Sequence, residues 1–165
     1  MWISFFSINQ HVAGERPMDF WSGTFMSSIK EIGHVVMVAM PYDNPAPLTR
    51  AWCLWEVYCA VRTESKFEVA MDKDEEIAFV NDMIQNFTSF FDLLGNIDTR
   101  KSEAFKPHDK EAIHEAVRRE VGFDALNSLV YKPLRDWTID CMDQLFRAIE
   151  AKLRCDNEHI HFISL

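Results

Sequence analysis

The strongest candidate for chemistry in this chain is the carboxylate of Glu56. It is the only charged side chain between Arg50 and Arg62, and none of the residues three or four positions from it is basic. Apolar residues around it recur with a 3.6-residue period, which predicts an amphipathic helix that places Trp52 and Glu56 one turn apart. A carboxylate without a counter-ion on its own helix could stabilise a positively charged ligand or intermediate. The alternative is a solvent-facing side chain, or one paired with a basic residue elsewhere in the fold.

A second polar cluster, Asn9-Gln10-His11, follows the apolar run Trp2–Ile8. We expect that run to form a buried strand, which puts the cluster at the carboxyl end of the strand, where polar side chains commonly contact ligands. Hydrogen bonds that cap the loop are an equally good explanation. In open α/β sheets, ligands bind outside the carboxyl ends of the strands. The cluster and the start of the Arg50 helix should therefore share one edge.

The elements that position these residues alternate along the chain. Further strands are expected at His34–Met40, Lys66–Met71 and, very short, Asn96–Asp98. Helices are expected at 19–32, 50–64, 74–90, 107–121 and 124–154, the last broken or kinked near Pro133. Strands that alternate with helices predict an α/β fold with a doubly wound parallel sheet. We expect one domain over residues 1–155 and a loose tail over residues 156–165.

Composition excludes several functions. The formal net charge is −9 and no compact basic patch interrupts it, so a nucleic-acid partner is not expected. No apolar run reaches the roughly 20 residues that span a bilayer, and no signal peptide is visible, so we expect a cytoplasmic chain without membrane contact. The chain has no HExxH motif, and the His159-x-His161 pair lacks further ligands, so no metal is expected. The glycine-rich phosphate-binding loops are also missing.

The segment Trp52-Cys53-Leu54-Trp55-Glu56, after an apolar strand and a proline-rich loop, resembles the Trp-Cys-x-x-Glu pattern at the start of the third helix of TIR domains. WISFFSINQH resembles the second strand of that family and its following loop. Together with PLTRAWCLWEV, it is similar to divergent TIR-like domains of unicellular eukaryotes. The resemblance covers residues 2–71 and weakens through residue 137. It implies a flavodoxin-like sheet from which the first, central TIR strand is missing, with a long helix at the C-terminus.

Many TIR domains hydrolyse NAD at the nicotinamide–ribose bond, with the glutamate of the motif as the catalytic residue. The resemblance therefore implies a catalytic role for Glu56 and NAD as substrate, with no cofactor. It implies that Trp52 lines the nucleotide pocket, and we expect Cys53 of the same motif and the cluster Asn9, Gln10 and His11 to take part in nucleotide binding. A different possibility is a non-enzymatic signalling module that self-associates through TIR-type surfaces. A third is a nucleotide-processing enzyme of flavodoxin-like fold whose pocket lies away from Glu56.

Overall fold

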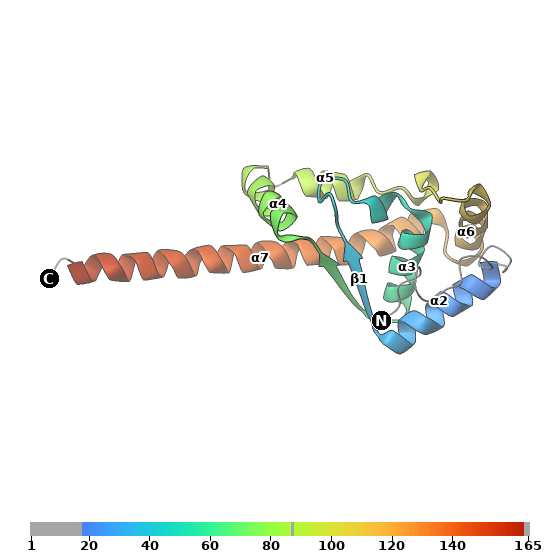
Figure 1. Ribbon diagram of the computed structural model, residues 1–165, viewed down its shortest axis with the longest axis horizontal. Helices are drawn as coiled ribbons and strands as arrows, with labels where there is room; N and C mark the ends of the chain where they lie inside the picture. Colours follow the sequence, from blue (N-terminus) through green and yellow to red (C-terminus); the bar gives the residue numbers. More distant parts are fainter. Residues whose placement is uncertain (1–17, 87, 164–165) are drawn as a thin grey trace.

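The computed structural model describes residues 18–86 and 88–163. The expected strand Trp2–Ile8 and the cluster Asn9-Gln10-His11 lie outside the described residues. The described chain is a mixed α/β structure that is mostly helical, with a small sheet and a long C-terminal helix (Figure 1).

The sheet consists of two parallel strands, β1 (His34–Val38) and β2 (Lys66–Ala70). Their register pairs His34 with Lys66 and Val38 with Ala70. The helix α3 (Ala51–Arg62) connects them, as expected for parallel neighbours, which need a crossover. The expected strand at Asn96–Asp98 is wrong, because this segment is a loop that leads into the short 3-10 helix η3 (Thr99–Lys101).

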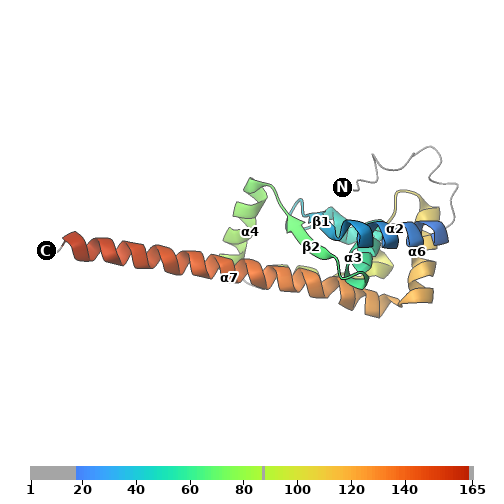
Figure 2. The ribbon, with the colours of Figure 1, turned by 90° about the horizontal axis from the view of Figure 1, so that it is seen from below.

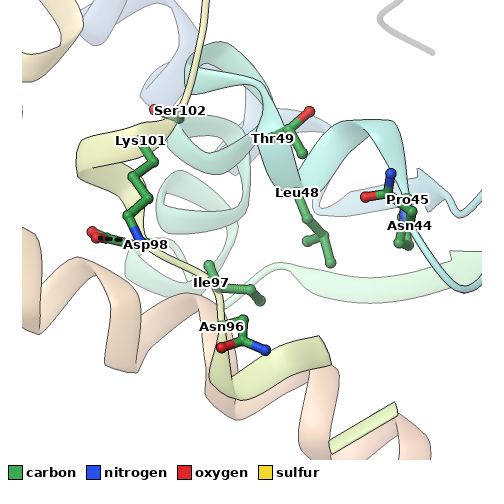
Figure 3. A pocket seen from close by; sticks show the side chains of 9 residues that line it. All are labelled: Asn44, Pro45, Leu48, Thr49, Asn96, Ile97, Asp98, Lys101 and Ser102. Atoms are coloured by element: carbon green, nitrogen blue, oxygen red, sulfur yellow. Dashed lines mark ion pairs between the residues drawn. The ribbon is translucent and has the colours of Figure 1, made fainter. Parts of the chain in front are cut away.

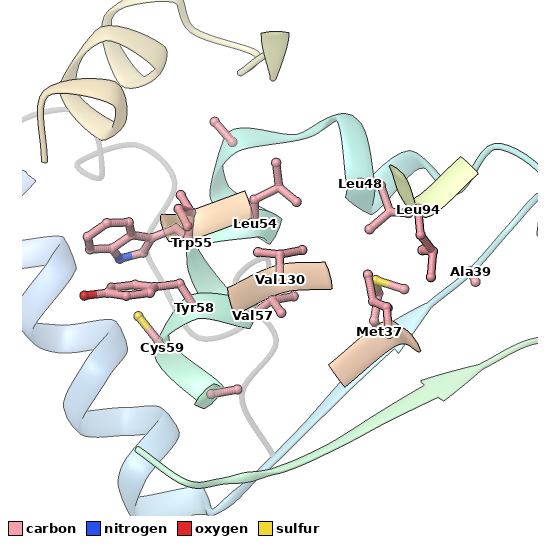
Figure 4. Close-up of a cluster of buried hydrophobic side chains, with 14 of the residues drawn as sticks. Met37, Ala39, Leu48, Leu54, Trp55, Val57, Tyr58, Cys59, Leu94 and Val130 are labelled. Carbon is pink, nitrogen blue, oxygen red and sulfur yellow. The ribbon is translucent and has the colours of Figure 1, made fainter. Parts of the chain in front are cut away.

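The helix α3 lies at the centre of the molecule. It packs against α2 (Met18–Ile32), α6 (Pro107–Glu120) and α7 (Phe123–Ile163), as well as the sheet. Its expected apolar stripe is confirmed, because Leu54, Val57 and Tyr58 are buried. Figure 4 shows these side chains together with Val130 of α7 and Met37 of β1. The motif helix is therefore part of the hydrophobic core.

Among residues 18–86 and 88–163, no element covers one face of β1. Met37 is buried, whereas Val36 and Val38 are 50% and 53% exposed. Successive side chains of a strand point to opposite faces, so the described elements that pack on the sheet cover only one of them.

The predicted helix over residues 74–90 is two helices, α4 (Lys73–Gln85) and α5 (Ser89–Gly95). The Asp72 side chain caps α4, accepting hydrogen bonds from the backbone N–H groups of Asp74 at 3.0 Å and Glu75 at 2.9 Å. These bonds satisfy two of the N–H groups that the first helical turn leaves without partners.

The C-terminal helix α7 is 41 residues long and passes through Pro133 without ending. The flanking Val130 and Leu134 are fully buried, so packing offsets the hydrogen bond that proline removes. The helix continues to Ile163, over residues for which a loose tail was expected. Its C-terminal part projects from the body as a single helix in both views (Figures 1 and 2). No helix among the described residues is both long and apolar enough to cross a membrane.

Candidate functional site

Glu56 lies near the middle of α3 and is half-buried. No described residue forms a hydrogen bond or an ion pair with its carboxylate. Burial raises the pKa of Glu56 to about 7, and the positive charge of Arg50 opposes this shift only in part. The protein therefore holds a carboxylate that is close to half-protonated at neutral pH.

Two cysteines lie near this carboxylate on the same helix. Burial, with a contribution from the charge of Glu56, raises the pKa of Cys53 to about 11 and that of Cys59 to about 12. Because the thiolate is the nucleophilic form of cysteine, neither thiol is poised for attack at neutral pH. Of these three groups, only the Glu56 carboxylate has a pKa near neutral pH.

Trp52 lies one helical turn before Glu56 and is half-buried between α2 and α6. Its ring packs against Phe25 of α2, with 5.3 Å between the ring centroids and 41° between the planes. Its indole Nε1 donates a hydrogen bond to Asp109 Oδ2 of α6 at 3.4 Å. The structure therefore fixes the orientation of Trp52, and Phe25 covers part of the indole.

Trp55 has a structural role, in agreement with its position away from Glu56 on the helical wheel. It is fully buried, and its ring lies 5.0 Å from that of Tyr58. Its Nε1 is buried without a hydrogen-bond partner among the described residues. The burial of this large aromatic group outweighs the cost of one unsatisfied donor.

A pocket of about 230 Å³ lies where the loop after β1 meets the segment between α5 and α6 (Figure 3). Backbone hydrogen bonds from Ala51 N to Glu103 O, 2.9 Å, and from Glu103 N to Thr49 O, 2.8 Å, hold these two segments together. The pocket is lined by Asn44, Pro45, Leu48, Thr49, Asn96, Ile97, Asp98, Lys101 and Ser102. Glu56, Trp52 and Cys53 do not line it.

Sequence reasoning did not find this pocket. The available signal was the position of the proline-rich loop directly after β1, at the carboxyl edge where ligands bind in α/β sheets. The opposite wall, from Asn96 to Ser102, was interpreted instead as a short strand.

Many polar groups of the pocket are already engaged by the protein. Asp98 accepts a hydrogen bond from Arg100 N at 3.1 Å, which, with the nearby positive charges, holds its pKa below the usual range. Ser102 Oγ donates to Thr99 O at 2.7 Å and lies 3.2 Å from His114 Nε2. Burial lowers the pKa of His114, so its imidazole is neutral at neutral pH. The pocket is suited to a small polar ligand more than to a strongly charged one.

The described residues contain no group of three or more His, Cys, Asp and Glu side chains that could hold a metal ion. Comparisons of the chain with protein-family models, with curated proteins and with solved structures gave no match.

Proposed function

We propose that this chain is a TIR-like domain with a flavodoxin-like fold that binds NAD and hydrolyses the nicotinamide–ribose bond with Glu56 as the essential carboxylate. The observation that carries the proposal is the half-buried Glu56 without a partner among the described residues, one helical turn from Trp52. The parallel pairing of β1 and β2 around α3 supports the architecture.

The proposed reaction needs one carboxylate. Cleavage leaves an oxocarbenium-like ribosyl cation, which an adjacent negative charge stabilises, as in glycoside hydrolysis. Nicotinamide leaves as a neutral molecule because the pyridinium takes up the bonding electron pair, so it requires no general acid. Water adds to the ribosyl carbon, and Glu56 accepts the proton that this water loses.

The ionised form of Glu56 is the active form in this scheme. With its pKa raised to about 7, the carboxylate is ionised only in part at neutral pH. We therefore expect the rate at low NAD concentration to rise with pH through about 7 and then level off. The positive pyridinium of bound NAD favours the ionised carboxylate, so at saturating NAD the midpoint should lie at lower pH.

The test measures nicotinamide release from NAD by the wild-type chain and by Glu56→Gln, which keeps the size of the side chain but removes its charge. We expect a loss of about 100-fold or more, typical of removing a group that stabilises charge in the transition state. The matched control is Glu111→Gln, because Glu111 is an exposed glutamate on α6. Full activity in Glu56→Gln would refute the assigned role.

The pocket beside η3 supports a second candidate, a nucleotide-processing enzyme whose ligand binds away from Glu56. Its lining includes the Asn44 and Asn96 side chains at the carboxyl side of β1. The pocket would hold only a small, uncharged part of NAD, so Asn44→Ala should then weaken NAD binding in calorimetry, while Glu56→Gln should bind NAD as the wild type does. The opposite result would favour the Glu56 site.

The open face of β1 supports the non-enzymatic alternative, a signalling module that self-associates. Val36 and Val38 form an exposed apolar surface there. This alternative predicts that light scattering detects oligomers that Val38→Lys disperses, with no nicotinamide released at any enzyme concentration. Measurable turnover that depends on Glu56 would rule it out as the whole function.

A further inference from the structure

The projecting part of α7 carries an apolar stripe that the described residues leave uncovered. Phe146 is 56% exposed, Ile149 41% and Leu153 58%. These are large side chains on a helix that leaves the body of the molecule (Figures 1 and 2). A helix with an exposed apolar stripe gains most of its stability from packing, so this segment is suited to a partner.

The spacing of the stripe identifies the kind of partner. Ile139, Met142, Phe146, Ile149 and Leu153 are separated alternately by three and four residues. This is the a and d spacing of a coiled coil, with a at 139, 146 and 153 and d at 142 and 149. Met142 is buried in the core of the body, so the part of this series that is open to a partner is Phe146, Ile149 and Leu153. In the sequence the same spacing continues to Ile160 and Ile163, with Asp156 at the one d position that is polar. A single polar core position reduces stability and can fix the register of a coiled coil.

The flanking charges favour a second copy of this chain in parallel orientation. The e positions hold Asp143 and Glu150, and the g positions hold Leu145 and Lys152. An antiparallel pair of identical helices would place e against e and so bring acidic side chains together. In a parallel pair, Glu150 lies opposite Leu145 of the partner subunit, so this repulsion does not arise.

Ion pairs within α7 offset the negative charge of the e positions, so that two copies of the helix can lie side by side. Arg147 pairs with Asp143 at 2.6 Å, and Arg154 pairs with Glu150 at 3.6 Å. Each pair joins residues four apart, which supports the helix and balances the acidic e positions. The stripe between them therefore stays apolar and its borders are close to neutral.

We propose that α7 is a dimerisation element, which joins two copies of this chain through a parallel coiled coil over the stripe from Phe146 to Leu153. The interface is separate from Glu56, from the pocket beside η3 and from the open face of β1.

The first test measures the mass of the full chain by sedimentation across a micromolar concentration range. We expect a species of twice the chain mass of 19.3 kDa that dissociates on dilution. Leu153→Glu buries an uncompensated charge in each helix of the interface and should weaken dimerisation by about 100-fold or more. Ala151→Glu is the matched control, because Ala151 is exposed at the outward f position two residues away. A wild-type chain that stays monomeric, or equal effects of the two substitutions, would overturn the proposal.

The second test measures orientation. Ile149→Cys, in a chain with Cys141 and Cys155 replaced by Ser, places a thiol at a d position that faces itself only in a parallel, in-register dimer. Mild oxidation should then produce a covalent dimer, whereas the same chain with Ile149 intact should not. Circular dichroism of each variant confirms that the body remains folded. A dimer that persists in solution but fails to cross-link would overturn the parallel arrangement.

Discussion

At the scale of single residues, Glu56 shows what a sequence can and cannot establish. Its lack of a helical counter-ion follows from the identities of the residues one turn away. Its half-buried position and raised pKa come from the packing around α3, which local sequence does not contain. Trp52 is similar, because its position one turn before Glu56 was predictable, whereas its contacts with Phe25 and Asp109 join elements far apart in the chain.

The raised pKa of Glu56 predicts how stability changes with pH. The folded chain binds this proton more tightly than the unfolded chain, because the pKa rises from 4.5 to about 7 on folding. The contribution of protonated Glu56 to the free energy of unfolding is therefore fully present below pH 4.5. It is lost as the pH rises to about 7. Glu56→Gln should match the wild type at pH 4 and exceed its free energy of unfolding by at most about 2–3 kcal/mol at pH 8.

Urea unfolding of both proteins at pH 4, 6 and 8 measures this difference. Glu111→Gln should show no comparable trend, since Glu111 is exposed. Equal stabilities of Glu56→Gln and the wild type at all three pH values would contradict the burial of the carboxylate. A variant that is more stable but inactive would separate the proposed role of Glu56 in NAD hydrolysis from any role in folding.

At the scale of elements, patterns with a clear period predicted type and position well. The helices α2, α3 and α6 and the strands β1 and β2 lie within a few residues of their expected limits. The errors occur where tertiary packing overrides a local signal. Pro133 should interrupt a helix, yet buried neighbours carry α7 through it. The expected strand at Asn96–Asp98 was a run too short for periodicity to identify.

The cap of α4 gives a prediction at this scale. Asp72→Ala removes the acceptor for the N–H groups of Asp74 and Glu75, and should lower the free energy of unfolding by about 1 kcal/mol. Asp74→Ala is the control, because it removes a negative charge from the same helical turn but leaves the cap in place. Its cost should be only about 0.3–1 kcal/mol, from the loss of its interaction with the helix dipole. Thermal unfolding of the two variants measures the difference, and a larger loss for Asp74→Ala would contradict the capping role.

At the scale of the whole molecule, neither the open face of β1 nor the projection of α7 was predictable. A continuous apolar strand is compatible with burial on one side or on both, and only the placement of other elements decides between them. An apolar helical stripe likewise does not reveal whether its partner lies in the same chain.

The charge of the molecule predicts that it does not bind nucleic acid. The net charge is −9, and ion pairs within the chain engage many of its arginines: Arg100, Arg118, Arg119, Arg135, Arg147 and Arg154. We expect no change in the fluorescence anisotropy of labelled duplex DNA or single-stranded RNA at roughly 0.15 M salt. Binding that weakens steeply as salt is added would reveal a basic surface and contradict this expectation.

The central position of α3 has a consequence for engineering this chain. Leu54, Trp55 and Cys59 of α3 are buried in the hydrophobic core. Trp52 and Glu56, the residues of the candidate site, lie on the same helix. Random substitutions in this helix will therefore reduce the amount of folded protein more often than they alter the proposed site alone. Substitutions in the loops that surround the helix should be tolerated more often.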